Sequence, residues 1–367
     1  MNFRGVFYIL LSINILACEV NNTPPVQPEH ELANPQIWQE LGRHLFYDRR
    51  LSVHENRSCG ICHEQAKGFT DGFVRAVGAT EEVHPRNTLT LINVSTRTSL
   101  GWITLEPEHL ETQLLIPLLG VMPVEMGLEG LLTERMADLN QDPIYKDFIS
   151  ELELDRLTLE DLSTAIACFE RAINSYRSPY DDYLAGQEHA LSLSAQRGLI
   201  LFNEELDCQQ CHGGKDFDQP KSSVLDSTTD KPSARHGWFN TGLYNLNDGR
   251  YPNDREGLFE VTGLDDDIGK YRVPTLRNLS FTRPYYHDGS GANLDDVLQN
   301  YNAGGRVIES GPYIGDGRQH PNKHPLIKKL ELLPEEVEDL KAFLLSLNDE
   351  YIVTDPQFSD PWQREGE

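Results

Sequence analysis

Two copies of one short motif, Cys-x-x-Cys-His, constrain this chain more than any other part of its sequence. Residues three apart share one face of a helix, so both thiols can bond one porphyrin while the next histidine ligates its iron. The motif is the attachment signal for c-type haem, and two copies predict two covalently bound c-type haems. The haem-binding residues are then Cys59, Cys62 and His63 in the first copy and Cys208, Cys211 and His212 in the second.

Cysteine pairs of this spacing also build zinc sites and dithiol redox centres, which are the alternatives to haem. A zinc site takes four ligands, usually from pairs that lie close together in the sequence. Here the two pairs lie far apart, and each is followed at once by histidine. The haem interpretation is therefore favoured.

The composition describes an acidic chain that is long enough for two domains. It has 367 residues and a formal net charge of −26, from 58 acidic and 32 basic side chains. Such a surface repels nucleic acid and anionic membranes and favours a protein partner with a basic patch. The alternative is that the acidity only keeps a secreted protein soluble.

The N-terminus predicts export to the periplasm. An apolar run at 6–16 follows Arg4 and is too short to span a membrane, which is typical of a signal peptide within residues 1–18. The run ends at Ile15-Leu16-Ala17-Cys18, which resembles a lipoprotein signal and would make Cys18 a lipid anchor. Residues 19–34 are polar and proline-rich and are expected to form a tether.

The apolar pattern predicts a mainly α-helical fold with long loops and little β-structure. Trp38, Leu41, Leu45 and Phe46 form the stripe of a helix that leads into the first haem motif. Further helices are expected at 109–125, 158–176, 293–301, 334–347 and from 194 to the second motif. We expect cytochrome c-like domains at 35–187 and 188–350, each around one covalent haem, and a tail at 351–367.

Three further segments resemble those of a known family. They are Pro123-Val124-Glu125-Met126-Gly127, the run from Val273 to Asn278, and the run from Pro284 to Gly289. Together with both haem motifs they resemble the bacterial di-haem cytochrome c peroxidase/MauG superfamily over roughly residues 35–350. The resemblance implies hydrogen peroxide as substrate, a peroxidatic N-terminal haem and an electron-transfer C-terminal haem.

The same resemblance assigns roles to single residues. Glu125 would act as acid–base catalyst, because cleavage of bound peroxide needs a proton moved between its two oxygens. Gln113 matches the glutamine upstream of it, although the spacing is slightly longer here than is usual. Trp102 matches a tryptophan between the haems that relays electrons, with plain core packing as the alternative. A calcium ion would be held by Asn87 and by the carbonyls of Thr282 and Pro284.

Two departures from the family pattern decide which branch this chain resembles. Where reductively activated peroxidases carry a histidine that blocks the N-terminal haem, this chain has Ala79, which cannot ligate iron; nearby His84 is the alternative ligand. The distal ligand of the second haem, usually methionine, is matched by Tyr301, fourteen residues after His287. Tyrosinate stabilises oxidised iron, whereas methionine favours reduced iron. The alternative is that Tyr301 only packs against neighbouring side chains and does not ligate the iron.

An open first haem and a tyrosine-ligated second haem resemble the MauG/MbnH branch. The sequence therefore predicts a peroxide-dependent di-haem oxidoreductase that uses a high-valent di-haem state to oxidise a residue of a partner protein. The alternative enzyme is a cytochrome c peroxidase that reduces hydrogen peroxide to water with electrons from a small redox protein. A two-haem electron carrier without enzymatic activity is the third hypothesis.

Overall fold

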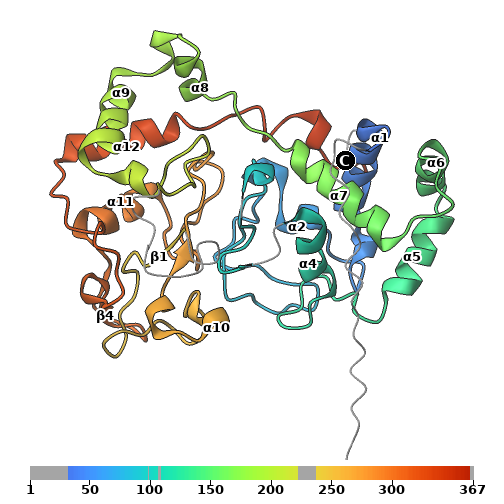
Figure 1. Ribbon diagram of the computed structural model, residues 1–367, viewed down its shortest axis with the longest axis horizontal. Coiled ribbons are helices and arrows are strands. Elements are labelled where there is room, and N and C mark those ends of the chain that lie inside the picture. The colour runs from blue at the N-terminus through green and yellow to red at the C-terminus, as the bar shows by residue number, and fades with distance from the viewer. Residues whose placement is uncertain (1–31, 98, 106–108, 222–236, 364–367) are drawn as a thin grey trace, which may run out of the picture.

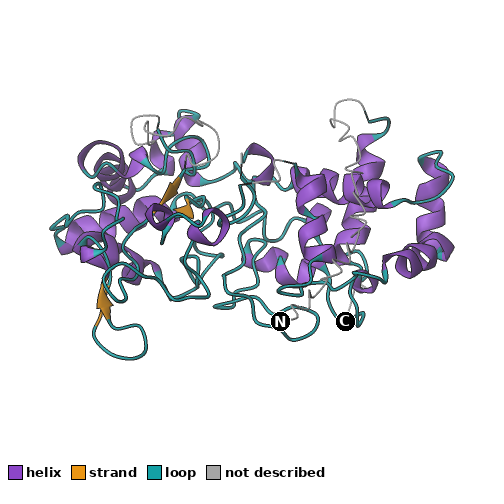
Figure 2. Cartoon of the chain, turned by 60° about the horizontal axis from the view of Figure 1, so that its bottom comes forward, coloured by secondary structure: helices purple, strands orange, loops and turns teal. Residues whose placement is uncertain are grey.

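The computed structural model describes residues 32–97, 99–105, 109–221 and 237–363, so the predicted signal, Cys18 and most of the tether lie outside it. Within these ranges the chain forms two helical lobes with a zone of loops between them (Figures 1 and 2). The predicted mainly helical fold is confirmed. No helix of the described ranges is both long and apolar enough to cross a membrane.

The N-terminal lobe is built around the crossing of α1 (Pro35–Tyr47) and α7 (Leu159–Ala172). Gly42 permits the close approach, since a Cβ there would collide with the Ala165 carbonyl. Thr158 and Asp161 form a capping box at the start of α7, as the sequence predicts. The lobe also contains α2 (Cys59–Cys62), α3 (Leu110–Gln113), α4 (Leu115–Leu119), α5 (Leu132–Gln141) and α6 (Pro143–Glu151).

The C-terminal lobe repeats this arrangement with α9 (Leu193–Ile200) and α12 (Pro334–Leu345). Gly198 lies against the Asp339 carbonyl, where a Cβ would again collide. In each lobe a helix that precedes the haem motif thus crosses the last helix of the lobe at a glycine. The other helices are α8 (Pro179–Leu184), α10 (Phe259–Thr262) and α11 (Leu294–Ala303).

The described β-structure consists of short antiparallel pairs, both in the C-terminal lobe. β1 (Trp238–Phe239) pairs with β2 (Tyr271–Arg272) in the register Trp238↔Arg272, and β3 (Val307–Ile308) pairs with β4 (Gly315–Asp316). Short helical turns complete the chain at Arg49–Leu51, Gln65–Lys67, Val94–Thr96, Glu188–Ala190, Leu201–Glu205, Cys208–Gln210, Asp265–Asp267, Gly317–Gln319 and Pro356–Phe358.

The hydrophobic cores divide the chain differently from the predicted domain limits. Tyr180 packs against Phe217 and Phe343, so the C-terminal core begins at α8 rather than after residue 187. The segment predicted as a tail returns to the N-terminal lobe (Figure 1), where Phe358 is part of the first core. Trp362 Nε1 donates to the His44 carbonyl at 3.0 Å, which fixes the end of this segment on α1.

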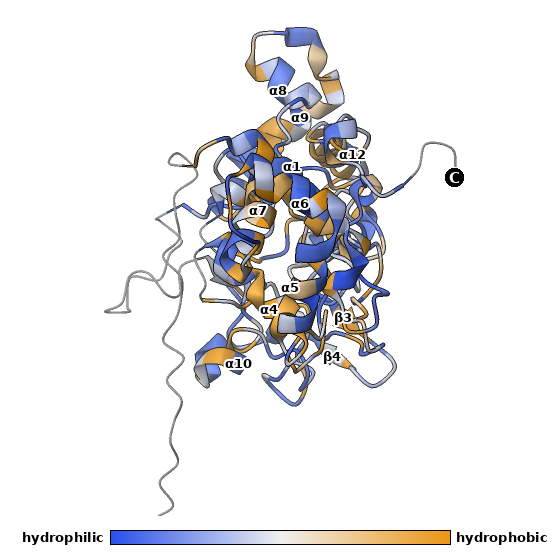
Figure 3. Cartoon of the chain, turned by 90° about the vertical axis from the view of Figure 1, so that its right-hand side faces the viewer, coloured by the Kyte–Doolittle hydropathy of each residue, from blue (hydrophilic) through white to orange (hydrophobic). Residues whose placement is uncertain are grey.

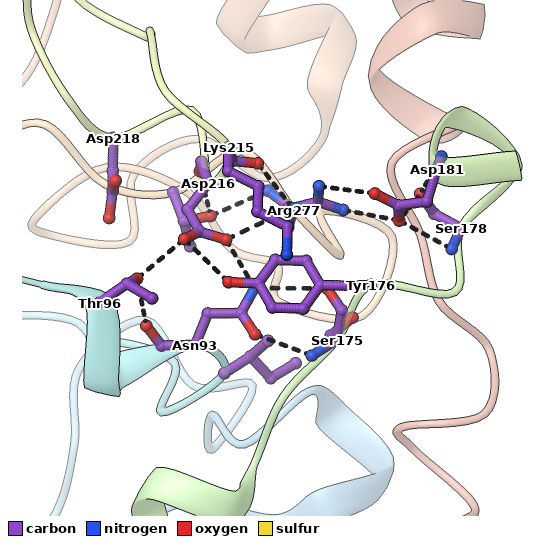
Figure 4. A network of polar contacts seen from close by, with 12 residues as sticks. Asn93, Thr96, Ser175, Tyr176, Ser178, Asp181, Lys215, Asp216, Asp218 and Arg277 are labelled. Atoms are coloured by element: carbon purple, nitrogen blue, oxygen red, sulfur yellow. Dashed lines mark hydrogen bonds and ion pairs between the residues drawn. The ribbon is translucent and has the colours of Figure 1, made fainter. Parts of the chain in front are cut away.

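A buried polar network holds the lobes together beside the second haem motif (Figure 4). Asp216, which follows that motif, accepts hydrogen bonds from Asn93 Nδ2 at 2.7 Å and Thr96 Oγ1 at 2.8 Å in the N-terminal lobe. It also accepts one from the Tyr176 hydroxyl at 3.1 Å and lies 3.4 Å from Arg277 Nε. One carboxylate therefore joins both lobes and the segment that connects them.

We expect Asp216→Ala to destabilise the protein by about 3 kcal/mol, because several buried donors lose their acceptor and Arg277 keeps only one of its two neighbouring carboxylates, Asp181. The measurement is the midpoint of urea unfolding of the holoprotein, with the exposed Asp182→Ala as control. A midpoint equal to that of the control would contradict this assignment.

Candidate active site

The first haem motif forms a single helical turn, and its histidine is held in one tautomer. Cys59 and Cys62 lie at the two ends of α2, and the His63 ring follows directly. His63 Nδ1 donates to the Phe69 carbonyl at 3.0 Å, so its Nε2 carries the lone pair. Burial lowers the pKa of His63, which keeps the ring neutral. A neutral, oriented imidazole is the form that binds iron.

The second motif has the same local geometry. His212 Nδ1 donates to the Phe217 carbonyl at 3.0 Å, and burial lowers the pKa of His212 to about 4. In both motifs the carbonyl that accepts the proton belongs to a phenylalanine five or six residues further along the chain. Each copy thus provides paired thiols next to a neutral histidine.

Tyr301 of α11 faces the second motif across an apolar pocket. Cys208, Cys211, His212 and Tyr301 all line this pocket, and most of its other lining side chains are apolar. Burial raises the pKa of Tyr301 far above its usual value, with smaller contributions from Tyr286, Cys211 and Cys208. Among the described residues its hydroxyl has no hydrogen-bond partner, which leaves the oxygen available for an iron ligand bond.

Two buried arginines show that the pocket suits a haem, which carries two carboxylates. Arg97 and Arg272 both line it, and Arg97 Nε and Arg272 Nη2 are buried without a hydrogen-bond partner in the described structure. Asp218 Oδ2 lies 3.7 Å from Arg97 Nε, too far for a hydrogen bond. Burial and the neighbouring charge of Arg97 lower the pKa of Arg272 to about 9, and Asp218 offsets this only in part. Propionates would supply further negative charge here. The sequence analysis missed both residues.

Glu125 lies beside the first haem motif. The hydrophobic helix α4 (Figure 3) binds this segment through the backbone, since Met126 N donates to the Pro117 carbonyl at 2.9 Å. About 41% of the Glu125 side chain is accessible, yet its carboxyl is recessed enough that burial raises its pKa to about 7. Its charge acts on the thiols of Cys59 and Cys62, which places it near the first motif.

Ala79, at the position of the blocking histidine, and His84, the alternative ligand, both lie next to Glu125. Ala79 is buried, and its N–H donates to the Glu125 carbonyl at 2.7 Å. His84 Nδ1 lies 3.8 Å from Glu125 Oε1. Gln113 lies on α3, and no hydrogen bond joins its side chain to Glu125 in the described structure.

Trp102 lies between the two lobes. Its Nε1 donates to the Asn87 carbonyl at 2.8 Å, and its ring packs edge-on against Tyr271 at 6.4 Å and His287 at 6.5 Å. Its own carbonyl accepts from Arg272 N at 3.0 Å. The tryptophan thus contacts both lobes at the wall of the second haem pocket, as a relay between the haems requires.

Comparison with known proteins identifies the family. Residues 37–189 match the model of the family described as di-haem cytochrome c peroxidase. The cytochrome-c peroxidase IdrP1 of Denitromonas iodatirespirans is 30% identical over 92% of this chain and 89% of its own length. The chain belongs to the di-haem cytochrome c peroxidase/MauG family. It is therefore a peroxide-dependent di-haem oxidoreductase of the peroxidase class.

Both branches of the family are represented among the relatives. The methylamine utilization protein MauG of Methylorubrum extorquens is 29% identical over 91% of this chain and 85% of its own length. A crystal structure described as a MauG-like protein associated with microbial copper homeostasis is 38% identical, with a TM-score of 0.85 over 95% of this chain and 99% of that one.

The predicted calcium ligands of this peroxidase-family chain lie on neighbouring loops. Asn87, Thr282 and Pro284 all line the pocket between the lobes. Asn87 Nδ2 donates to the Phe73 carbonyl at 2.7 Å, which leaves Oδ1 as the atom available to a cation. The described residues contain no cluster of three or more histidine, cysteine, aspartate or glutamate side chains suited to a metal. Calcium would therefore depend on amide and carbonyl oxygens, and it stays a prediction.

Glu170 is a buried carboxyl of the N-terminal lobe of this family member, and no sequence motif marks it. Glu170 of α7 is buried, and its Oε2 has no hydrogen-bond partner among the described residues. Burial raises the pKa of Glu170 to about 8, and its charge acts on the Cys59 thiol. On α7 this position belongs to the helix face that packs inward, which the helical period alone could have indicated.

Because the pKa of Glu170 is higher folded than unfolded, the folded state binds the proton more tightly. Its contribution to stability is present below about pH 4.5 and is lost as the pH rises towards 8. We expect Glu170→Gln to be more stable than the wild type at pH 8 by on the order of 2 kcal/mol, and no more stable at pH 5. Urea unfolding at both pH values tests this, with exposed Glu160→Gln as control. A gain that does not depend on pH would contradict it.

Proposed function

We propose that this protein uses hydrogen peroxide to oxidise a residue of a partner protein, as in the MauG/MbnH-like branch of its family. The observation that carries the proposal is Ala79. A small, buried side chain that cannot ligate iron lies against the backbone of Glu125, where reductively activated peroxidases carry a blocking histidine. The N-terminal haem would then be accessible to peroxide in its ferric state.

The haem-binding residues would be the paired thiols, which attach each porphyrin covalently, and His63 and His212, which ligate the irons. When bound, the haems supply the two electrons that reduction of peroxide requires. Glu125 handles the proton that moves between the two peroxide oxygens. Its pKa of about 7 suits this task, since such a carboxyl can both hold and release a proton near neutral pH.

The second haem would be tuned for shared oxidation rather than for electron delivery from a small donor. Tyr301 supports this, because its hydroxyl lies in the second pocket without a hydrogen-bond partner among the described residues. Trp102, which contacts both lobes, would carry electrons between the haems and from the partner protein. The 38% identity to a MauG-like protein over nearly the whole chain also favours this branch.

Three further parts of the proposal concern the location of the enzyme, its calcium ion and its partner protein. We propose export to the periplasm, with or without a lipid anchor at Cys18, and a calcium ion at Asn87, Thr282 and Pro284. The net charge of −26 favours a partner protein with a basic patch. These parts rest on sequence patterns and on the oxygen groups gathered near Asn87.

The second candidate function is that of a cytochrome c peroxidase, because relatives with that name are 30% identical to this chain. Steady-state assays with peroxide and either a reduced small c-type cytochrome or a reduced cupredoxin separate the two functions. The proposal expects slow turnover, well below the roughly 10 per second of a typical enzyme. Turnover at or above that rate with either donor would favour the peroxidase function instead.

A further inference from the structure

The imidazole of His84 is a buried group beside Glu125 that the proposed function does not use. Its side chain is 12% exposed, and its Nε2 is fully buried without a hydrogen-bond partner in the part of the chain that the structure describes. A buried ring nitrogen without a hydrogen-bond partner destabilises the folded protein. Such a nitrogen can be satisfied by a reactant that enters the pocket.

The loop that carries His84 is bound to the loop that carries Glu125. Val124 N donates to Glu82 Oε2 at 3.0 Å, and Ala79 N donates to the Glu125 carbonyl at 2.7 Å. These contacts hold His84 Nδ1 at 3.8 Å from Glu125 Oε1. That separation is slightly longer than a hydrogen bond, and a proton can cross it through small movements of either side chain or through one bound oxygen.

The two groups have opposite pKa shifts, both caused mainly by burial. Burial raises the pKa of Glu125 to about 7 and lowers that of His84. A hydrogen bond with the Val124 backbone and the charges of Glu82 and Asp71 partly offset the shift of His84, whereas Arg86 adds to it. Near neutral pH the pair therefore holds one proton, on Glu125, beside a neutral imidazole. Such a division is typical of an acid and a base that work together.

We propose that His84 accepts a proton from hydrogen peroxide while Glu125 donates one to it. The inference rests on the proposed function and goes beyond it, because it divides the proton transfer between two side chains. His84 takes the proton of the inner peroxide oxygen. The O–O bond then breaks with its electron pair on the outer oxygen, which takes the Glu125 proton and leaves as water. A haem held by the first motif would supply the two electrons of this reduction.

The pair returns to its starting state without a further reactant. After the O–O bond has broken, His84 is protonated and Glu125 is ionised, so the charges attract across the short gap between them. The proton then returns from His84 to Glu125. No net proton is taken from solvent, and water is the product that leaves.

The pH dependence of the peroxide reaction tests this division. Ferric holoenzyme is mixed with hydrogen peroxide from about pH 5 to 9, and the rate of the Soret change is recorded. The wild-type rate should fall as the pH rises through about 7, because Glu125 loses the proton that it donates. In His84→Gln, Glu125 has to take and give the same proton. The rate should then be lower by on the order of 100-fold and should rise with pH over the same range.

A matched control and a spectroscopic readout complete the experiment. Exposed His189→Gln should leave both the rate and its pH profile unchanged. The ferric spin state of the N-terminal haem, measured by EPR, should be the same in the wild type and in His84→Gln. A change from low to high spin in His84→Gln would show that His84 ligates iron and would overturn the proposal.

An unchanged rate and pH profile in His84→Gln would also overturn it. The proposed function would survive that result if Glu125→Gln still lost the reaction, so the two failures can be told apart. His84→Asn carries the same expectations if His84→Gln yields no folded holoprotein, as judged by haem content and circular dichroism.

Discussion

Glu125→Gln is expected to slow the reaction of the ferric holoenzyme with hydrogen peroxide by about 1,000-fold, within the range that a positioned acid–base group contributes. The amide keeps the size of the side chain but can neither hold nor release the proton. Burial raises the pKa of this carboxyl to about 7, so the wild-type residue is protonated in a useful fraction of molecules near neutral pH. Stopped-flow absorption at the Soret band measures the rate.

The control for this prediction is Glu129→Gln. Glu129 is exposed and lies four residues further along the same loop. Its replacement should leave the rate unchanged, and both variants should retain two haems per chain. If Glu125→Gln reacted as fast as Glu129→Gln, Glu125 would have no part in the chemistry, and the third hypothesis of an electron carrier would gain support.

Tyr301→Met is expected to raise the reduction potential of the C-terminal haem by on the order of 100 mV, because thioether ligation favours reduced iron and phenolate ligation favours oxidised iron. Tyr301 and His212 line the same pocket, and on our proposal the exchange therefore replaces an iron ligand. A spectroelectrochemical titration of each haem measures the shift. The variant should also turn over small electron donors faster than the wild type.

Tyr286→Phe is the matched control, since Tyr286 lines the same pocket but its hydroxyl is engaged by Asn300 Nδ2 at 2.8 Å. It should shift the potential far less than Tyr301→Met does. Equal potentials in the wild type and Tyr301→Met would show that the tyrosine does not ligate iron. The argument for the MauG/MbnH-like branch would then rest on Ala79 alone.

The haem motifs and the helices with strong caps could be predicted from the sequence because their signals are local. The capping box at Thr158 and the cap at Asn293 both appear in the structure. Helices α5 and α6 were missed, although the Asp142 cap and Pro143 give α6 a local start signal. The packing of Phe358 on the first core was also missed, because contacts between residues over 300 positions apart leave no periodic signal.

The residues of the candidate site also differ in whether the sequence could predict them. Glu125 and Tyr301 could be singled out because they lie at fixed distances from recognisable motifs. Arg97 and Arg272 could not, because a buried guanidinium is recognised only by the absence of solvent and partners around it. His84 was considered as an iron ligand from its place in the loop. Its position 3.8 Å from Glu125 follows from loop-to-loop hydrogen bonds that no sequence pattern encodes.

The most direct test of the central claim uses the as-isolated diferric protein without any reductant. One equivalent of hydrogen peroxide is added, and the Soret band is followed. An open N-terminal haem beside Ala79 predicts a prompt change and a long-lived oxidised product. No reaction until one haem has been reduced would contradict the account. The protein would then be a reductively activated cytochrome c peroxidase whose first haem is blocked, with His84 as the ligand to examine first.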